Sequence, residues 1–343
     1  MKLIIDCLGG DNSPLAQVEG SLRALAAHED LSLALVGDEP TLKTLLTERS
    51  APMERIELFH APGVITGEDK PTDAIRLKKD ASMIAALRLL REQKDAAGLV
   101  SAGATGALVA AATLRIGRIR GIRRPAFCPI LPTMNGGIVG ICDSGANVDI
   151  LPEQLQQQAV MASLYLESAF GVRAPRVALL NVGTESEKGD DLRKTAYPLL
   201  ARTPGINFVG NMESRDLLTG KYDVVVCDGF SGNVLCKTTE GTALELLKKL
   251  KKEIYSKTKY KLGALFMKEL FHDLADFMNY QNYGGSVLLG TEKTIVKGHG
   301  SSDAAAMAVC IDQAYRMTTA DLNGKIGAAL AAIAEKEKEL SES

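Results

Sequence analysis

The chain has 343 residues, of which 46% are hydrophobic and 24% charged, and a formal net charge of −2 at pH 7. These shares are ordinary for a soluble globular protein, and the length suffices for one large or two modest domains. No excess of lysine and arginine points to nucleic acid as a partner. No apolar run approaches the roughly 20 residues of a membrane span, and residues 1–6 have no signal-peptide pattern. These features predict a cytoplasmic protein.

Hydrophobic runs alternate with stretches of helical pattern along the first 240 residues. Five runs rich in Val, Leu and Ile are typical of buried parallel strands, at 2–6, 99–101, 177–181, 224–228 and 295–297. Helices are predicted over 15–27, 41–47, 73–91, 106–116, 152–170, 192–200 and 239–252. Segments 127–131 and 138–143, on either side of a Gly-rich turn, predict an antiparallel hairpin. The alternation predicts an α/β sheet with helices on both faces.

Each of the five runs ends in a loop rich in glycine and polar residues. Loops at the carboxyl ends of parallel strands line the ligand crevice of such a sheet, and their amides favour an anion, which we expect to be phosphate. The residues predicted to bind phosphate or substrate are Gly9, Gly10, Asp11, Gly103, Thr105, Asn181, Gly183, Thr184, Gly229, Ser231, Gly232, Asn233, Gly300, Ser301 and Ser302.

Some of these residues have a structural alternative. Ser231 and Asn233 could instead cap the helix that follows them, and Ser301, Ser302 or Asp303 could cap the next predicted helix, which begins at residue 304. Asp11 repels phosphate by its charge and is expected to orient a lysine or to cap a helix.

Several common motifs are missing from the sequence. The absence of G-x-G-x-x-G and of G-x-x-x-x-G-K-[ST] disfavours a dinucleotide dehydrogenase and an ATP-dependent kinase. There is no G-x-S-x-G nucleophile elbow. The four histidines lie far apart, and the cysteines form no C-x-x-C pair, so we predict neither a metal site nor a cofactor. The cysteines are interpreted as small buried side chains: Cys7, Cys128, Cys142, Cys227, Cys236 and Cys310.

Seven short blocks follow one another from the first strand to residue 303. They are DCLGGD at 6–11, SAGATGA at 101–107, DSGAN at 143–147, LNVGTE at 180–185, DGFSGN at 228–233, NYGG at 282–285 and HGSSD at 299–303. In this order they resemble the bacterial phosphate acyltransferase family of phospholipid synthesis (PlsX). The resemblance implies transfer of a fatty acyl group from acyl carrier protein to inorganic phosphate, giving acyl phosphate. It also implies a three-layer α/β/α, Rossmann-like fold related to phosphotransacetylase and the isocitrate dehydrogenase group.

The resemblance further implies roles for Lys188 and His299. Lys188 matches a lysine implicated in the family's catalysis, where it would neutralise charge on phosphate or on the developing oxyanion. From residue type alone, the alternative is a solvated lysine paired with Glu185 or Glu187. His299 would donate a hydrogen bond to phosphate. The family usually carries Asn where this chain has Ala104, so no polar contact is assigned there.

Segment 243–280 is basic and apolar, and we expect it to form a helical hairpin within a single domain, 1–343. Three compatible interpretations are a homodimer interface, docking to an anionic membrane surface, and binding of acidic acyl carrier protein. The residues assigned to these contacts are Lys248, Lys249, Lys251, Lys252, Leu262, Leu265 and Phe266. A peripheral membrane location follows, with the downstream membrane glycerol-3-phosphate acyltransferase as a partner. The alternative functions are a phosphotransacetylase acting on acyl-CoA, and a non-catalytic, membrane-associated organiser of lipid-synthesis enzymes.

Overall fold

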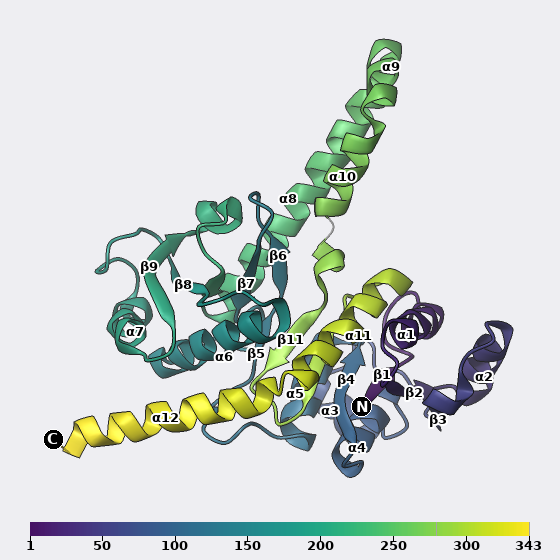
Figure 1. Cartoon of the computed structure of the whole chain (residues 1–343), viewed down its shortest axis with the longest axis horizontal. Helices are drawn as coiled ribbons and strands as arrows, with labels where there is room; N and C mark the ends of the chain where they lie inside the picture. The colour runs from purple at the N-terminus through teal and green to yellow at the C-terminus, as the bar shows by residue number, and fades with distance from the viewer. Residues whose placement is uncertain (279, 343) are drawn as a thin grey trace.

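The computed structural model describes residues 1–278 and 280–342, and it contains two β-sheets flanked by helices (Figure 1). The first sheet has the strand order β3-β2-β1-β4-β12-β11-β5. Its first five strands are parallel, and β11 is antiparallel to both of its neighbours. These strands are β1 (Lys2–Asp6), β2 (Ser32–Gly37), β3 (Ile56–His60), β4 (Ala96–Ser101), β5 (Ala126–Cys128), β11 (Ser286–Leu289) and β12 (Thr294–Lys297).

The second sheet has the order β6-β7-β10-β8-β9 and is parallel except for the β6–β7 pair. Its strands are β6 (Ile130–Pro132), β7 (Ile138–Cys142), β8 (Arg176–Asn181), β9 (Asn207–Glu213) and β10 (Val224–Val226). The five predicted runs therefore all contain strands, but in two sheets rather than one. A buried hydrophobic run does not specify its pairing partner, and the sequence pattern could not separate the sheets.

Of the predicted hairpin between 127–131 and 138–143, only the part from residue 130 onward pairs as expected. β6 pairs with β7 as expected, but β5 pairs with β11 in the first sheet. Pro129 lies between β5 and β6. Because proline has no N–H to donate to a strand ladder, it favours a break at this point.

The helices of the structure are α1 (Leu15–Ala27), α2 (Glu39–Glu48), α3 (Pro71–Leu77), α4 (Ser82–Glu92), α5 (Thr105–Arg115), α6 (Pro152–Phe170), α7 (Asp191–Arg202), α8 (Gly229–Ser256), α9 (Thr258–Phe266), α10 (Lys268–Met278), α11 (Ala304–Thr319) and α12 (Leu322–Glu342). The helices predicted over 15–27, 41–47, 106–116, 152–170 and 192–200 lie where α1, α2, α5, α6 and α7 are found, to within two residues at each end. Three short 3₁₀ turns are Met53–Arg55, Ser214–Thr219 and Tyr280–Tyr283.

Two predicted helices need correction. The single helix expected over 73–91 is wrong, because α3 ends at Leu77 and the chain forms a bridge between Gly63 and Ala81 before α4 begins. The helix expected over 239–252 is the middle of the much longer α8. Asp228 starts α8 by accepting a hydrogen bond from the Ser231 amide at 2.8 Å.

The core explains why the first sheet is covered on both faces. Successive side chains of a strand point to opposite faces, so Leu3 and Ile5 pack on the side of α1 and α11, whereas Ile4 packs on the side of α4 and α5. All three side chains are fully buried, and burying each of them stabilises the folded state by about 1.5–3 kcal/mol. The predicted α/β/α layering is therefore confirmed, and the six cysteines are buried and free, as expected.

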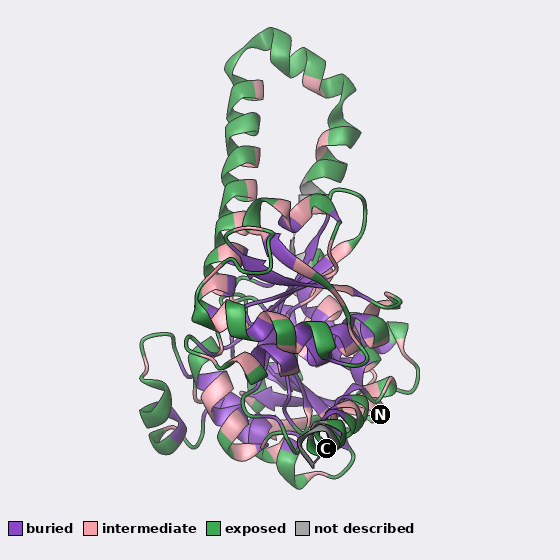
Figure 2. Cartoon of the chain, turned by 90° about the vertical axis from the view of Figure 1, so that its left-hand side faces the viewer, coloured by how far each residue is buried: buried purple, intermediate pink, exposed green. Residues whose placement is uncertain are grey.

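One part of the molecule stands away from the sheets. The second half of α8, together with α9 and α10, projects as a long arm (Figure 1), and nearly all of it is exposed (Figure 2). Among the described residues, no helix combines the length and apolar character that a membrane crossing requires.

Candidate active site

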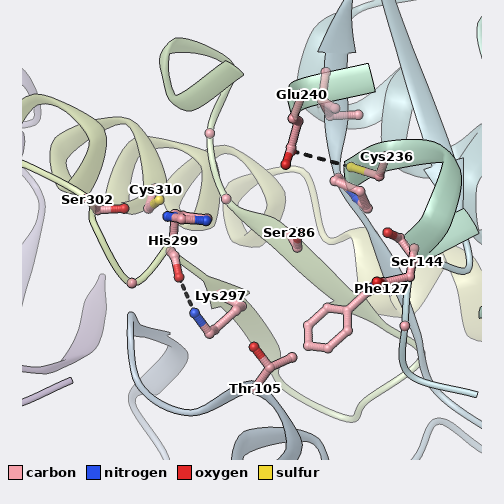
Figure 3. Close-up of a pocket in the computed structure, with 18 of the residues that line it drawn as sticks. Thr105, Phe127, Ser144, Cys236, Glu240, Ser286, Lys297, His299, Ser302 and Cys310 are labelled. Atoms are coloured by element: carbon pink, nitrogen blue, oxygen red, sulfur yellow. Dashed lines mark hydrogen bonds between the residues drawn. The ribbon is translucent and has the colours of Figure 1, made fainter. Parts of the chain in front are cut away.

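A cavity of about 470 Å³ lies between the two sheets, at the carboxyl ends of their strands (Figure 3). The first sheet contributes the loop after β12 and the first turn of α5. The second sheet contributes the loop after β7 and the first half of α8. This space, here called the inter-sheet cavity, is where both sheets present their loops.

Lys297 supplies a buried positive charge in the wall of the inter-sheet cavity. It ends β12, opposite Ser101 of β4, and is only 9% exposed. Its Nζ donates to the Ala102 carbonyl oxygen at 3.3 Å and to that of Gly298. Burial lowers the pKa of Lys297 to about 8, although nearby acidic groups, among them Asp6, oppose this shift. A partly desolvated ammonium next to a cavity is suited to holding an anion.

Asp6 lies in the polar cluster behind Lys297. Its carboxylate accepts hydrogen bonds from Ser101 Oγ at 2.6 Å and Ser82 Oγ at 2.5 Å. Burial raises the pKa of Asp6, while these hydrogen bonds and the charge of Lys297 act in the opposite direction. The carboxylate at the end of β1 is thus fully partnered and helps to compensate the buried ammonium.

The glycines of the first loops are required for close packing. A Cβ on Gly9 would lie 2.4 Å from the backbone nitrogen of Gly103, so Gly9 cannot carry a side chain unless the loop of Gly103 moves. Gly10 has a φ of +101°, and the amide of Asp11 donates to the Gly300 carbonyl oxygen at 2.7 Å. The Asp11–Gly300 hydrogen bond holds the loop that follows Lys297 and carries His299.

His299 stands at the rim of the inter-sheet cavity. The backbone N–H of Ser301 donates to its Nδ1 at 3.2 Å, and Ser301 Oγ lies 2.8 Å from the same nitrogen. Because a backbone amide only donates, Nδ1 is the acceptor and the neutral ring carries its proton on Nε2. Partial burial lowers the pKa of His299, and the positive charge of Lys297 lowers it further. Both effects favour a neutral ring that donates through Nε2.

The N-terminus of α5 also faces the inter-sheet cavity. Thr105 and Gly106 line it, and the preceding residue, Ala104, has no side-chain group that could cap the helix. The first amides of a helix need acceptors and carry its positive dipole end. In α11, by contrast, Asp303 accepts from the Ala306 amide at 2.9 Å, so the expected capping alternative holds for Asp303 rather than for Ser301 or Ser302.

The opposite wall comes from one face of α8. Asn233, Cys236, Lys237 and Glu240 recur there at helical spacing. Cys236 Sγ donates to Glu240 Oε1 at 3.4 Å, and burial raises the pKa of Glu240. Figure 3 shows this pair across the cavity from Lys297.

Only some of the residues predicted to bind phosphate or substrate line the inter-sheet cavity. Thr105, Asn233, His299, Gly300 and Ser302 line the inter-sheet cavity. Those placed elsewhere are Gly9, Gly10, Asp11, Gly103, Asn181, Gly183, Thr184, Lys188, Gly229, Ser231, Gly232 and Ser301.

The loop that carries Lys188 is exposed and held by its own contacts. Asn181 Nδ2 donates to the Lys188 carbonyl oxygen at 3.0 Å, while the Lys188 and Thr184 side chains face solvent. Nearby, Arg193 donates to Asp228 at 2.7 Å and lies 3.3 Å from Ser231 Oγ. Asp228 therefore both caps α8 and pairs with Arg193. The sequence had suggested Ser231 or Asn233 as the cap of this helix and had not considered Asp228.

Close packing also accounts for two glycines of α8. A Cβ on Gly229 would lie 2.5 Å from the Asn147 carbonyl oxygen, and one on Gly232 would lie 2.0 Å from that of Asp143. Both glycines let the helix start against the loop after β7.

Sequence reasoning missed several lining residues, above all Lys297 and Glu240. A signal for Lys297 was present, because a charged residue closing the buried run Ile295–Val296 is unusual in a strand covered on both faces. Glu240 gave no comparable signal, since glutamate is common on exposed helix faces. Within the described residues, no group of three or more His, Cys, Asp or Glu side chains is arranged to hold a metal ion.

The fold belongs to a known class of α/β proteins. A phosphotransacetylase from Streptococcus pyogenes has the same fold, with a TM-score of 0.63 at 15% sequence identity over 93% of this chain and 94% of that one. A family model described as "Fatty acid synthesis protein" matches residues 1–325, and the chain belongs to this family.

Curated relatives carry a more specific name. The chain is 44% identical over 326 residues to a phosphate acyltransferase of Clostridium acetobutylicum, covering 95% of this chain and 98% of the relative. It is also 44% identical over 319 residues to a phosphate acyltransferase of Bacillus subtilis, covering 93% and 95%.

Proposed function

We propose that this chain is an acyltransferase that moves a fatty acyl group from acyl carrier protein to inorganic phosphate and releases an acyl phosphate for phospholipid synthesis. The observation that carries the proposal is the buried ammonium of Lys297 beside the uncapped N-terminus of α5 in the inter-sheet cavity. Both groups attract a compact dianion. The name shared by relatives at 44% identity supports the same reaction.

In this proposal phosphate is itself the nucleophile. Lys297 and the first amides of α5 hold the dianion, and one phosphate oxygen forms a bond to the thioester carbonyl carbon. The Nε2–H of His299 donates to the carbonyl oxygen as it gains negative charge. The carbon–sulfur bond breaks, and the proton of HPO₄²⁻ passes to the departing thiolate sulfur. Because the nucleophile arrives already ionised, neither a serine–histidine pair nor a cofactor is required, and positioning supplies much of the acceleration.

The exposed loop after β8 is assigned to the donor side of this reaction. Asn181 ends β8 in the second sheet, and Gly183, Thr184 and Lys188 lie in the loop that follows it, whereas Lys297 ends β12 in the first sheet. We assign Lys188 to the thioester or its oxyanion, while Lys297 holds phosphate. Charge from both sheets would then converge on the reacting groups when the acyl donor binds between them.

The direct test is an assay with purified protein, palmitoyl-acyl carrier protein and inorganic phosphate. Release of free carrier protein together with palmitoyl phosphate is expected. Turnover with acetyl-CoA but not with the carrier-protein donor would instead identify a phosphotransacetylase. No turnover with either donor would leave a non-catalytic organiser of lipid synthesis.

The arm is assigned to partners. Its tip, α9, exposes Leu262, Leu265 and Phe266, with 60%, 68% and 89% of each residue accessible. α8 also carries lysines on the arm, although Lys248 and Lys249 already pair with Glu245 and Glu253. We propose that the arm serves homodimer formation, peripheral attachment to an anionic membrane and capture of the acidic carrier protein. Attachment would bring acyl phosphate close to a membrane glycerol-3-phosphate acyltransferase, which would consume it.

Vesicle co-sedimentation tests the membrane part of this assignment. A lysine near an anionic surface contributes about 1 kcal/mol, so adsorption to anionic vesicles is expected to weaken with added salt. Phe266→Glu or Leu265→Glu is expected to weaken it through the apolar contact, while Leu77→Glu, an equally exposed leucine on α3, serves as the control. Equal recovery in the supernatant with neutral and anionic vesicles at both salt concentrations would restrict the arm to the dimer and the carrier protein.

A further inference from the structure

Glu240 is the only carboxylic acid among the described residues that line the inter-sheet cavity. It lies on α8, across the cavity from Lys297 (Figure 3). In the proposed reaction Lys297 holds phosphate and His299 stabilises the oxyanion, so this carboxyl group is left without a task. A partly buried titratable side chain in the wall of a reaction cavity is a candidate for proton transfer.

The surroundings of Glu240 favour a protonated carboxyl group. Its side chain also borders a small apolar hollow, whose walls include Leu131 and Met134. Its hydrogen-bond partner is the Cys236 thiol, at 3.4 Å, which is a weak donor. Burial raises the pKa of Glu240, whereas this hydrogen bond and the charge of Lys237 act in the opposite direction. Because burial has the largest effect, the site favours the form of the carboxyl group that carries a proton.

The position of Glu240 suits the departing sulfur. Phosphate reaches the thioester from the wall that contains Lys297 and the first turn of α5. In the tetrahedral intermediate the attacking oxygen and the sulfur are different substituents of one carbon, so the sulfur points away from that wall. The opposite wall is the face of α8 on which Glu240 lies. An alkyl thiol has an ordinary pKa of about 8.5, so its thiolate is basic and leaves more easily when a proton is supplied.

The other titratable groups of the wall are less suited to this step. His299 is a neutral ring whose Nε2–H is directed to the carbonyl oxygen, and Lys297 holds phosphate. Burial raises the pKa of the Cys236 and Cys310 thiols, so neither is a stronger acid than the thiol that forms. A carboxylic acid is a much stronger proton donor than a thiol, even when burial weakens it.

We propose that Glu240 is the acid that protonates the departing sulfur. The inference deepens the proposed function and rests on it. As the carbon–sulfur bond breaks, the carboxyl proton of Glu240 passes to the sulfur and gives the free thiol of the carrier protein. The carboxylate left behind takes up the proton that the phosphate group releases as acyl phosphate forms, with water carrying it across the cavity. The proton of HPO₄²⁻ thus reaches the sulfur by way of Glu240, and charge balances without another reactant.

The test varies the leaving group. Glu240→Gln keeps the shape of the side chain without its acidic proton. With palmitoyl-acyl carrier protein, kcat is expected to fall by about 10²-fold, the lower end of the range for acid catalysis, while the KM for phosphate stays unchanged. With 4-nitrothiophenyl palmitate, whose thiolate is stable without a proton, the fall is expected to stay within about threefold. Glu240→Asp should recover part of the loss with the carrier-protein donor.

Glu167→Gln is the matched control, because it makes the same substitution on an exposed face of α6. It should leave turnover of both donors unchanged. Equal losses of Glu240→Gln with both donors would give Glu240 a structural role and overturn the inference. Wild-type turnover of the carrier-protein donor by folded Glu240→Gln would overturn it too. Either result leaves the proposed function standing, whereas no turnover of any donor by the wild-type protein would contradict the proposed function and the inference together.

Discussion

Lys297 ends β12 in the first sheet and Lys188 lies in the loop after β8 in the second, and the surroundings of the two lysines differ sharply. Lys297 is buried among carbonyl oxygens next to Asp6, in the wall of the inter-sheet cavity, whereas Lys188 extends into solvent from the loop after β8. A charge acts more strongly where water is scarce, because the effective dielectric is lower and salt screens less. The comparison teaches that residue type and strand-end position did not distinguish the two lysines, while burial does.

The largest effect is expected from removing the buried charge. Lys297→Met keeps the unbranched shape of the side chain without its charged nitrogen and is expected to lower kcat/KM for phosphate by about 10³, the upper range for losing one preorganised charge-stabilising group. Lys297→Arg should recover part of that loss. Steady-state kinetics at varied phosphate measures it, with thermal unfolding as the check on folding.

Lys293→Met is the matched control for this change. Lys293 lies just before the opposite end of β12, where its Nζ donates to the Ala96 carbonyl oxygen at 2.8 Å. Its loss should leave phosphate kinetics unchanged. A folded Lys297→Met protein with wild-type kinetics would remove Lys297 from the site.

A smaller effect is expected from the exposed lysine. Lys188→Ala should lower turnover by about 10², the lower end of the same range, because solvent screens its charge until the donor covers it. The loss should fall on kcat rather than on the KM for phosphate. Lys194→Ala removes another exposed lysine from α7 and serves as the control. Near-normal turnover of a folded Lys188→Ala protein would return this residue to the solvated alternative.

The pH dependence of the reaction sharpens the assignment of Lys297. Since its pKa is lowered to about 8, the free protein holds the ammonium charge below that pH and loses it above. kcat/KM for phosphate should fall by about tenfold per pH unit on the alkaline side. This fall is the alkaline limb of the pH profile. Bound phosphate favours the charged lysine, so the alkaline limb of the kcat profile should lie at higher pH. In Lys297→Arg the limb should vanish from this range. A limb that persists there would belong to another group.

The sequence predicted the layers of the fold better than its site. Hydrophobic periodicity placed α1 and α6 to the residue and found every strand that carries a candidate loop, because burial imposes that pattern directly. It could not assign strands to two sheets, since pairing depends on contacts between distant segments. The same limit hid Glu240, which lines the inter-sheet cavity because α8, capped by Asp228, presents one face to it. The glycine motifs were recognised, but Gly9, Gly229 and Gly232 are explained by close packing against the backbone of another loop.

The smallest predicted effect comes from an exposed negative charge near the same lysine. Asp11 is exposed, and its charge raises the pKa of both Lys297 and His299. Asp11→Asn removes a like charge that opposes phosphate, so the KM for phosphate should fall by about two- to threefold at low salt and less at high salt. The alkaline limb should also move to lower pH, because Lys297 loses a neighbour that favours its charged form. Asp80→Asn makes the same change in net charge at an exposed site outside the inter-sheet cavity and should alter neither quantity. An increase in the KM would instead mean that Asp11 supports the bound phosphate by orienting Lys297, as the sequence first suggested, and that this contribution outweighs the repulsion.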